Sequence, residues 1–508
     1  MDRRRFLGRT GLLAAGMTFG PGLFSNRLVR QALAARSDRY LISVVLDGGN
    51  DGLNTITPIA DGSGTLRSDY EKARVAGSGG IRLLPDGTHP LLPLAVGGLS
   101  GDDPNTGAAL GMHPGLSGIV PGAIEASGDA GFGGLHELYR AGRVAVIQGC
   151  GFPDYNLSHD EARRVFHSAN PRGLAAFAST GWLGRTVAHP TYAFGSTDVP
   201  ALNVRDSVGG DFRATGTSVA AARRLSDFTM PRDVSAYSSD NAAKLAAIEA
   251  LYGVASTRPG SWRALGDSGT ATFGCMDYYP AASRLYLADR AAWSAGYDRM
   301  GLGTGRDLRE VAKAIYARES GDARIKSFAF RVDNGGYDTH SDQGGGDPTG
   351  QHWSLHAEVG ASLKHFFDDL DDMGSGVADR VTVLVWSEFS RRVRQNETGT
   401  DHGSQGPMFV VGGGVSGGVY GNHPNIAESD LGSDGNTRYR QGANDFRSTD
   451  VRDVYGTVLT RRLGLSAATV LDPTSGILRL DDGPADTRWT VQDFDLRRGS
   501  DGAPLFRV

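Results

Sequence analysis

Short apolar runs rich in β-branched residues recur along the chain, and each ends at a glycine or a polar cluster. Runs of this length and composition are typical of buried β-strands. They cover the segments Leu41–Leu46, Arg143–Gln148, Ser327–Val332, Val381–Trp386 and Met408–Val411. We therefore predict a buried sheet that contains these strands.

Amphipathic helical patterns lie between these runs. The clearest pattern places apolar residues along one face of a long helix, at Leu355, Val359, Leu363, Phe366 and Leu370. The same spacing predicts helices over Asn241–Tyr252 and Asp307–Ala317. Strands that alternate with helices predict an α/β fold, with a mostly parallel central sheet and helices on both faces. Such sheets carry their functional sites at the carboxyl ends of the strands.

Composition adds long loops and a large core to this picture. Glycine accounts for 73 of the 508 residues, roughly twice its usual share of about 7 %, which implies many tight turns. Polar, glycine-rich stretches predict surface loops at 60–80, 99–108, 205–240 and 425–448, with insertions near 205–240 and 425–448. The 52 basic and 57 acidic side chains give a formal net charge of −5, which argues against a nucleic-acid partner. We expect one large domain over residues 35–508.

The N-terminus has the layout of an export signal. Arginines at Arg3, Arg4 and Arg5 precede a weakly apolar stretch, and small residues up to Ala34 provide a cleavage site. Paired arginines in this position are typical of the twin-arginine route. We therefore predict that residues 1–34 are a twin-arginine signal peptide for the twin-arginine translocase, and that the protein is periplasmic or secreted. We expect no stable membrane span, because glycine and proline interrupt the apolar stretch.

The sequence leaves open whether the two cysteines, Cys150 and Cys275, form a disulfide. Neither belongs to a C-x-x-C pair, which excludes a cysteine zinc site and thioredoxin chemistry. An exported protein can pair two such cysteines in a disulfide. Two buried free thiols fit the sequence equally well.

Acidic and histidine side chains follow the predicted strands, where a parallel sheet carries its site. The segments at 47–52, 335–340, 387–392 and 399–403 read DGGNDG, GGYDTH, SEFSRR and GTDHG. Carboxylates and imidazoles suit divalent metals, and two metals about 3.5–4 Å apart need roughly this many ligands. One Asp-Gly turn after a strand is usually only a turn. Together, the four segments predict a metal site.

Ser158 precedes a helix predicted at 160–167 and has two interpretations. It stands where backbone N–H groups at a helix N-terminus favour an anion, and its hydroxyl is a candidate for a metal-activated nucleophile. Alternatively, Ser158 and Glu161 form an ordinary capping box. His352 and His356 stand four residues apart on the long helix as a candidate metal pair. His352 is the better ligand candidate, and a structural role fits His356.

The order of these motifs resembles a known family. A twin-arginine leader is followed by DGGNDGLN, N-x-S-H, TGWLGR at 180–185, GGYDTH, SEFSRR and GTDHG. This set resembles the exported bacterial family called domain of unknown function 1501 (DUF1501), over about residues 38–470. Tyr337 stands where the family usually has tryptophan, and Ser390 where it usually has glycine. Neither departure removes a candidate ligand.

That family is similar in turn to the alkaline phosphatase and sulfatase superfamily, which implies an α/β sandwich with a two-metal site. By this resemblance, Asp47 binds the metal that activates the nucleophile, and Ser158 is that nucleophile. Asp338 and His340 then bind the other metal. The superfamily's spacing from aspartate to histidine is longer, so His352 is the substitute for His340.

The last ligands map onto the superfamily in two ways. Asp401 and His402 resemble its Asp-His pair, but that pair normally ends a strand. We favour the second mapping, in which Glu388 binds the metal on the nucleophile side and His402 binds the other. Asp401 then either binds a metal directly or contacts a residue that does. We expect Arg391 or Arg392 to hold the substrate's anionic group with two hydrogen bonds; the alternative is a solvated basic turn.

The resemblance implies an exported metal-dependent hydrolase of phosphate or sulfate esters. Its cofactors would be two divalent metal ions, drawn from zinc, calcium, magnesium and manganese, and its substrate an anionic small-molecule or polysaccharide ester. The alternative is a non-catalytic metal- or ligand-binding protein on a hydrolase-like scaffold. A redox cofactor is disfavoured, because the sequence offers neither a credible dinucleotide loop nor a cysteine cluster.

Overall fold

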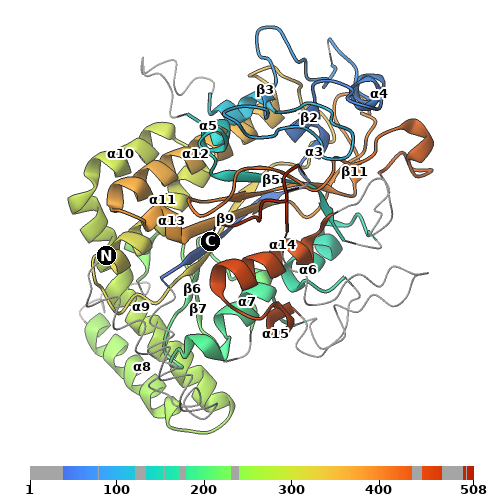
Figure 1. Cartoon of the computed structure of the whole chain (residues 1–508). Coiled ribbons are helices and arrows are strands. Elements are labelled where there is room, and N and C mark those ends of the chain that lie inside the picture. The colour runs from blue at the N-terminus through green and yellow to red at the C-terminus, as the bar shows by residue number, and fades with distance from the viewer. Residues whose placement is uncertain are drawn as a thin grey trace, which may run out of the picture.

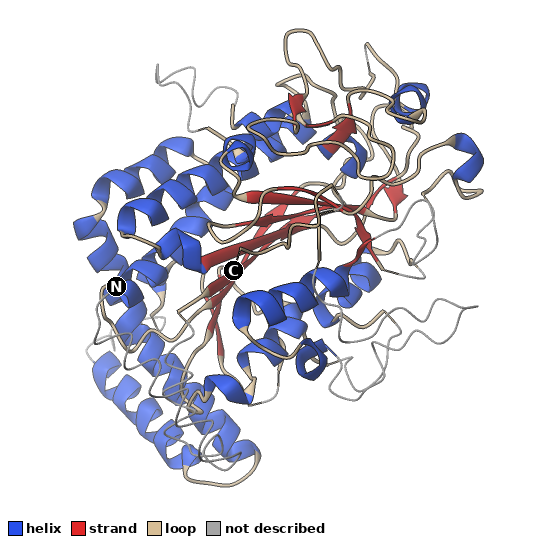
Figure 2. Ribbon diagram, viewed as in Figure 1, coloured by secondary structure: helices blue, strands red, loops and turns tan. Residues whose placement is uncertain are grey.

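A central sheet with helices on both faces forms the framework of the protein (Figure 1, Figure 2). The computed structural model describes residues 38–77, 79–119, 133–152, 155–171, 179–214, 216–229, 240–437, 449–471, 496–498 and 500–507. The predicted signal peptide, residues 1–34, lies outside the described residues.

The sheet has nine strands in the order β13-β5-β12-β9-β1-β8-β6-β7, with β14 beside β5. The strands are β1 (Tyr40–Asp47), β5 (Val144–Gly151), β6 (Ala201–Asn203), β7 (Val219–Ala221), β8 (Ala329–Gly335), β9 (Val381–Trp386), β12 (Gly406–Val411), β13 (Gly418–Tyr420) and β14 (Thr449–Asp450). β12 runs antiparallel to β5 and β9, and the other pairings are parallel. The predicted mostly parallel α/β sheet is confirmed, and all five predicted strands belong to it.

β1 lies inside the sheet because its sequence, YLISVVLD, is apolar on both faces. Its Ile42 and Val44 side chains have no exposed surface. In the register of the sheet, Asp47 stands opposite Gly335 of β8, and Val45 opposite Trp386 of β9. The three strands therefore end at nearly the same level, and the segments that follow them meet at one edge.

Helices pack on both faces of the sheet (Figure 1). On one face lie α5 (Leu135–Arg140), α10 (Ala291–Met300), α11 (Gly303–Glu319), α12 (Gln351–Met373) and α13 (Val377–Arg380). On the other lie α6 (His159–Ser168), α7 (Trp182–Val187), α14 (Val451–Thr457), its π-helical extension Val458–Leu463, and α15 (Ala467–Leu471). α8 (Asn241–Ser256) and α9 (Ser261–Asp289) form a hairpin that extends beyond the sheet. Among the described helices, none has both the length and the apolar character needed to cross a membrane.

Smaller elements surround the strand ends. They are α3 (Gly52–Thr55), α4 (Leu66–Ala73), a sheet of β2 (Ile56–Pro58), β3 (Leu92–Pro93) and β4 (Leu110–Met112), and the pair β10 (Ser390–Arg391) and β11 (His402–Gly403).

Two predicted loops contain regular structure. The loop predicted at 60–80 is wrong in part, because α4 lies within it and buries Leu66 and Tyr70. The stretch at 205–240 contains the edge strand β7, which at three residues is too short for its pattern to be recognised. Residues 230–239 and 438–448 of the two predicted insertions lie outside the described residues.

Both cysteines are buried free thiols, Cys150 on β5 and Cys275 on α9. Burial raises the pKa of Cys275 to about 12 and that of Cys150 well above its usual value. Of the two alternatives that the sequence leaves open, the structure therefore has the unpaired one, with both groups in the unreactive thiol form near neutral pH.

The turn after β1 depends on two glycines. Gly48 and Gly49 have φ angles of +125° and +80°, which L side chains rarely adopt. A Cβ atom on Gly48 would lie 2.4 Å from the backbone nitrogen of Asp338, in the segment after β8. Gly48 therefore allows the segments after β1 and β8 to touch.

We expect Gly48→Ala to destabilise the protein more than Gly87→Ala does. Gly87 also has a positive φ, +109°, but a Cβ there would meet nothing within 4 Å, so its alanine variant should cost only the conformational penalty of about 1–2 kcal/mol. Gly48→Ala adds an overlap with backbone, which should cost roughly 1–3 kcal/mol more. Denaturant unfolding of both variants measures the difference, and equal losses would contradict the close approach.

Candidate metal centre

The strand ends bring three acidic segments together. β9, β1 and β8 are neighbours in the sheet, so Asp47 at the end of β1 lies beside the segments that follow β8 and β9. These two segments carry Asp338 and Glu388. The sequence therefore located this edge correctly as the place where the candidate acids meet.

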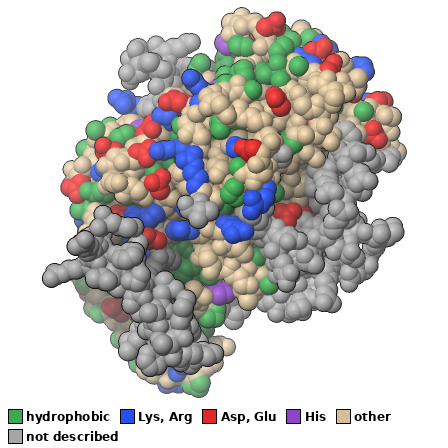
Figure 3. All heavy atoms as spheres, viewed as in Figure 1, with side chains coloured by type: hydrophobic (Ala, Val, Ile, Leu, Met, Phe, Trp, Pro, Cys, Tyr) green, Lys and Arg blue, Asp and Glu red, His purple; other side chains and the backbone are tan. Residues whose placement is uncertain are grey.

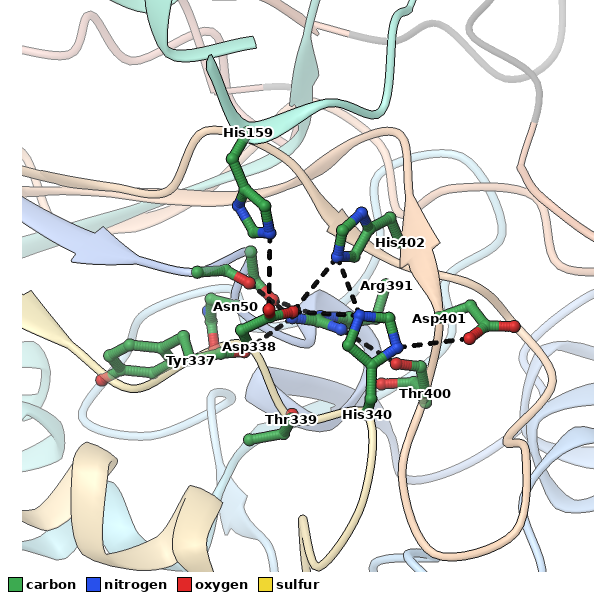
Figure 4. A network of polar contacts seen from close by, with 12 residues as sticks. Asn50, His159, Tyr337, Asp338, Thr339, His340, Arg391, Thr400, Asp401 and His402 are labelled. Atoms are coloured by element: carbon green, nitrogen blue, oxygen red, sulfur yellow. Dashed lines mark hydrogen bonds and ion pairs between the residues drawn. The ribbon is translucent and has the colours of Figure 1, made fainter. Parts of the chain in front are cut away.

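Two further segments close over this edge. β10 pairs with β11 in antiparallel register, which sets Arg391 opposite His402. α6 follows β5 and begins at His159. Its first turn thereby lies above the ends of the central strands, as Figure 4 shows for His159 and His402.

Three histidine side chains converge on one carboxylate (Figure 4). The Nε2 atoms of His340 and His402 lie 3.0 Å apart, and each is 3.1 Å from Asp338 Oδ1. His159 Nε2 lies 3.5 Å from Asp338 Oδ2. One ligand atom each from His159, Asp338 and His402 falls within 4.8 Å of the others. We call His159, Asp338, His340 and His402 the histidine cluster.

In each of these imidazole rings, the Nδ1 atom contacts an oxygen atom outside the cluster. The contacts run from His159 to Glu388 Oε1 at 2.8 Å, from His402 to the Leu157 carbonyl oxygen at 2.9 Å, and from His340 to Asp401 Oδ1 at 3.3 Å. Carbonyl and carboxylate oxygens accept hydrogen bonds, so in the neutral rings Nδ1 carries the hydrogen and Nε2 keeps a lone pair. Metal-ligating histidines are typically oriented by outer partners of this kind.

A divalent metal fits these donors. Three Nε2 lone pairs and a carboxylate converge, and without a cation or added protons they repel one another. Nitrogen ligands on one tetrahedral zinc ion are separated by roughly 3.3 Å, given Zn–N distances of about 2.0–2.1 Å. The separation of 3.0 Å between the Nε2 atoms of His340 and His402 is close to that value. The histidine cluster could therefore hold one metal ion.

Asp338 is the charged member of the cluster. Burial raises its pKa, but the hydrogen bond from Arg391, the contact with His402 and the charge of Arg391 outweigh burial and lower the pKa to about 2. The Asp338 carboxyl is therefore an anionic ligand at neutral pH, while nearly half of its side chain stays accessible.

Glu388 lies behind the cluster. Its side chain is fully buried, and the backbone N–H of Gly48 donates to its two oxygens at 3.0 and 3.2 Å. Since Glu388 Oε1 also accepts from His159, Glu388 acts on the metal position through that ring. Asp401 stands in the same relation to His340. The resemblance implies direct ligation by Glu388, whereas this arrangement makes both acids supports of histidines.

Asp47 contacts an arginine and not the histidine cluster. Its Oδ1 lies 2.8 Å from Nε of Arg163, which also approaches Glu388 Oε1 at 3.4 Å. Burial and the charge of Glu388 raise the pKa of Asp47, and Arg163 offsets part of that increase. Asp47 and Glu388, the predicted ligands of a second metal, thus share a guanidinium.

The predicted role of Arg391 as a substrate anchor does not agree with its surroundings. Its side chain has no exposed surface, and it donates a 2.6 Å hydrogen bond to Asp338 Oδ1. Its other hydrogen bonds go to the backbone carbonyls of Gly48, Gly49, Tyr337 and Thr400. Arg391 therefore ties strand-end segments together. Arg392 remains partly exposed, 3.6 Å from Asp401.

His352 lies outside the cluster. Its Nε2 contacts Asn50 Oδ1 at 2.9 Å, and its ring packs against His113 and His356 with centroids 5.1 and 4.1 Å away. Burial lowers the pKa of His352 well below its usual value, so it is a neutral core side chain. His340 itself faces Asp338, and His352 does not replace it.

Ser158 is the exposed N-cap residue of α6. Its hydroxyl makes no capping hydrogen bond, and Glu161 pairs with Arg164 at 2.9 Å. The capping box, which was the alternative to a nucleophilic serine, is therefore wrong. Ser158 follows Leu157, whose carbonyl oxygen contacts His402 Nδ1, and precedes His159.

Two residues of this site were missed from the sequence, His159 and Arg163. His159 is part of the N-x-S-H motif, which drew attention to the serine and not to its neighbour. The spacing of four residues between His159 and Arg163 was the available signal, because it places both on one face of α6.

We expect Arg391→Met to be much more destabilising than Arg392→Met. The first change leaves buried carbonyls and Asp338 without a donor, a loss of about 3–5 kcal/mol by analogy with broken buried ion pairs. The second removes a partly exposed pair worth roughly 1 kcal/mol or less. Thermal and denaturant unfolding measure both, and a stable Arg391→Met protein would refute the tying role.

Comparison with known families places the chain among its relatives. The family model described as "Protein of unknown function (DUF1501)" matches residues 145–438, more than half of the chain. The match includes all four members of the histidine cluster, while Asp47 precedes it. A search of curated proteins finds no match. The resemblance read from the motifs is thus confirmed at the level of the family: the chain belongs to the DUF1501 family.

Proposed function

We propose that this protein is a metal-dependent hydrolase of anionic esters, with phosphate and sulfate esters as the substrate class. The observation that carries the proposal is the convergence of three Nε2 atoms on the Asp338 carboxylate, with each Nδ1 engaged by an acceptor. This arrangement orients the lone pairs toward the same carboxylate and costs little to reorganise when a cation binds.

The donor set favours zinc among the four candidate metals. Imidazole nitrogen suits zinc, whereas calcium and magnesium prefer oxygen ligands. His159, His340 and His402 supply nitrogen, and Asp338 supplies oxygen. A divalent ion held there would act as a Lewis acid toward an ester oxygen.

Ser158 is the nucleophile of this proposal. Its neighbours on both sides are fixed by the cluster, since the Leu157 carbonyl holds His402 and the His159 ring faces Asp338. Ser158 is exposed to solvent beside them, and its hydroxyl is not used for capping. Ser158 is therefore adjacent in the chain to two residues that contact the cluster, and its hydroxyl makes no capping hydrogen bond.

The architecture agrees with an alkaline phosphatase-like sandwich, which is part of the proposal. A mostly parallel sheet lies between helical layers, and the cluster sits at the carboxyl ends of its central strands.

We also propose export by the twin-arginine translocase to the periplasm or beyond, on the strength of the arginine-rich N-terminus. An anionic polysaccharide ester or a small anionic ester would meet the enzyme there.

We expect the wild-type protein to bind zinc, and Asp338→Asn to weaken that binding more than about 100-fold. Losing an outer partner of a metal site costs about 10–100-fold, and Asp338 is a direct ligand in this proposal. Zinc titration of chelator-treated protein measures the affinity. His136→Asn is the control, because His136 bonds only to the Pro93 carbonyl in the described structure. Wild-type protein that takes up no divalent metal would refute the proposed centre.

We expect Ser158→Ala to keep its zinc and to lose hydrolysis of aryl phosphates or aryl sulfates by at least about 1000-fold, as other serine nucleophiles do. Ser354→Ala, an exposed serine on α12, is the matched control. Full activity in Ser158→Ala would exclude this nucleophile. Metal binding without turnover of any ester by the wild type would instead favour the non-catalytic alternative.

A further inference from the structure

We infer that the guanidinium of Arg163 takes the position of a second cation, so that this site holds one divalent metal beside a fixed arginine. The inference rests on the proposed function, because it concerns the same site. The resemblance to two-metal hydrolases assigns Asp47 and Glu388 to a second metal, and the structure gives both acids to Arg163.

Glu388 has little capacity left for a metal. Its Oε1 receives the His159 Nδ1 hydrogen at 2.8 Å and the Gly48 N–H at 3.0 Å, and Arg163 lies 3.4 Å away. Its Oε2 contacts the Gly48 N–H and the Ser387 hydroxyl, both at 3.2 Å. A metal at this carboxylate would have to displace donors that already neutralise it. A fully buried carboxylate with such partners is a satisfied structural anion.

Asp47 alone makes a weak metal site. Its side chain is 43 % exposed, and its Oδ1 pairs with Arg163 Nε at 2.8 Å. With Glu388 engaged elsewhere, one carboxylate remains where a metal needs several protein ligands. The donor set at this position therefore fits a guanidinium better than a second divalent ion.

α6 places the arginine and a histidine of the cluster together. His159 and Arg163 are four residues apart, so they project from the same face of the helix. Both contact Glu388 Oε1. α6 thus sets the distance between the metal position and Arg163, and the contacts of both side chains with Glu388 hold them in place.

Arg163 has capacity to act on a ligand. Its side chain is 30 % exposed, and within the part of the chain that the structure describes its NH1 group has only a distant partner, Asp160 at 3.7 Å. An oxygen of an anionic ester held at the histidine cluster would find N–H donors of Arg163 on the side where a second metal would otherwise stand. Arg163 is therefore assigned to the binding of the ester's anionic group, the role that buried Arg391 does not fill.

The metal stoichiometry of saturated, desalted protein tests this inference. We expect about one zinc per chain in the wild type and also in Arg163→Met, because Glu388 keeps its other donors and Asp47 alone makes a weak metal site. We expect the zinc-loaded Arg163→Met protein to lose about 10-fold or more in affinity for inorganic sulfate, because the N–H donors of Arg163 are gone. Arg164→Met is the matched control and should keep both one zinc and its affinity for sulfate. Arg164 is the next residue on α6, has a similar exposure of 28 %, and pairs with Glu161 instead.

Asp47→Asn adds a measurement that does not depend on the stability of Arg163→Met. If Arg163 is the cation at Asp47, this variant keeps about one zinc and loses affinity for inorganic sulfate or phosphate as Arg163 is released from its partner. If Asp47 binds a second metal, the wild type holds two and the variant holds one.

The outcomes separate the two proposals. Two zinc ions in the wild type would overturn the inference about Arg163 and leave the proposed hydrolase intact. Unchanged affinity for inorganic sulfate in folded, zinc-loaded Arg163→Met would also overturn it, because Arg163 would then not bind the anionic group. No zinc in the wild type would refute the proposed function itself.

Discussion

The buried guanidinium of Arg391 is the interaction on which the site depends. It joins segments that are far apart in the sequence: the turn after β1 through the carbonyls of Gly48 and Gly49, the segment after β8 through Tyr337 and Asp338, and the approach to β11 through Thr400. A guanidinium has five N–H donors in a fixed plane, which suits one group bonding several carbonyls at once. A buried charge of this kind is tolerable only when it is fully partnered. The arrangement of these segments is therefore strongly determined, and with it the position of the Asp338 carboxylate.

The histidines add a second constraint, which concerns the ring nitrogen that carries the hydrogen. Each Nδ1 faces an acceptor, and these acceptors come from different parts of the chain: the segment after β9, the segment before α6 and the residue before β11. The folded chain therefore fixes the tautomers of three rings together, and the free lone pairs all point inward. This explains why Glu388 and Asp401 matter to the site without contacting its centre. Removing either acid would free a ring to rotate or to change tautomer.

Much of this arrangement was accessible from the sequence. β1, β8 and β9 are long apolar runs, and the parallel-sheet rule places their following residues at one edge, so Asp338, His340 and His402 were correctly brought together. The direction of β12 was not accessible, because an apolar run has the same pattern in either direction. Arg391 was misjudged because β10 is only two residues long. Its pairing with β11 arises from tertiary packing, and it decides whether the arginine faces inward or toward solvent. Ser158 and His159 are neighbours at a helix start, where the pattern does not tell which side chain turns inward.

The balance of charge around the cluster links these observations to function. The carboxylates are Asp47, Asp338, Glu388 and Asp401, and the guanidiniums in contact with them belong to Arg163, Arg391 and Arg392. The four acids exceed the three arginines by one charge, so the site without a metal is slightly negative and disfavours an anion. A single divalent cation on the histidine cluster reverses that sign. Attraction of an anionic ester would then require the metal, since the three arginines are already balanced by acids. A site built in this way couples substrate binding to metal loading, and one metal ion is enough to do so.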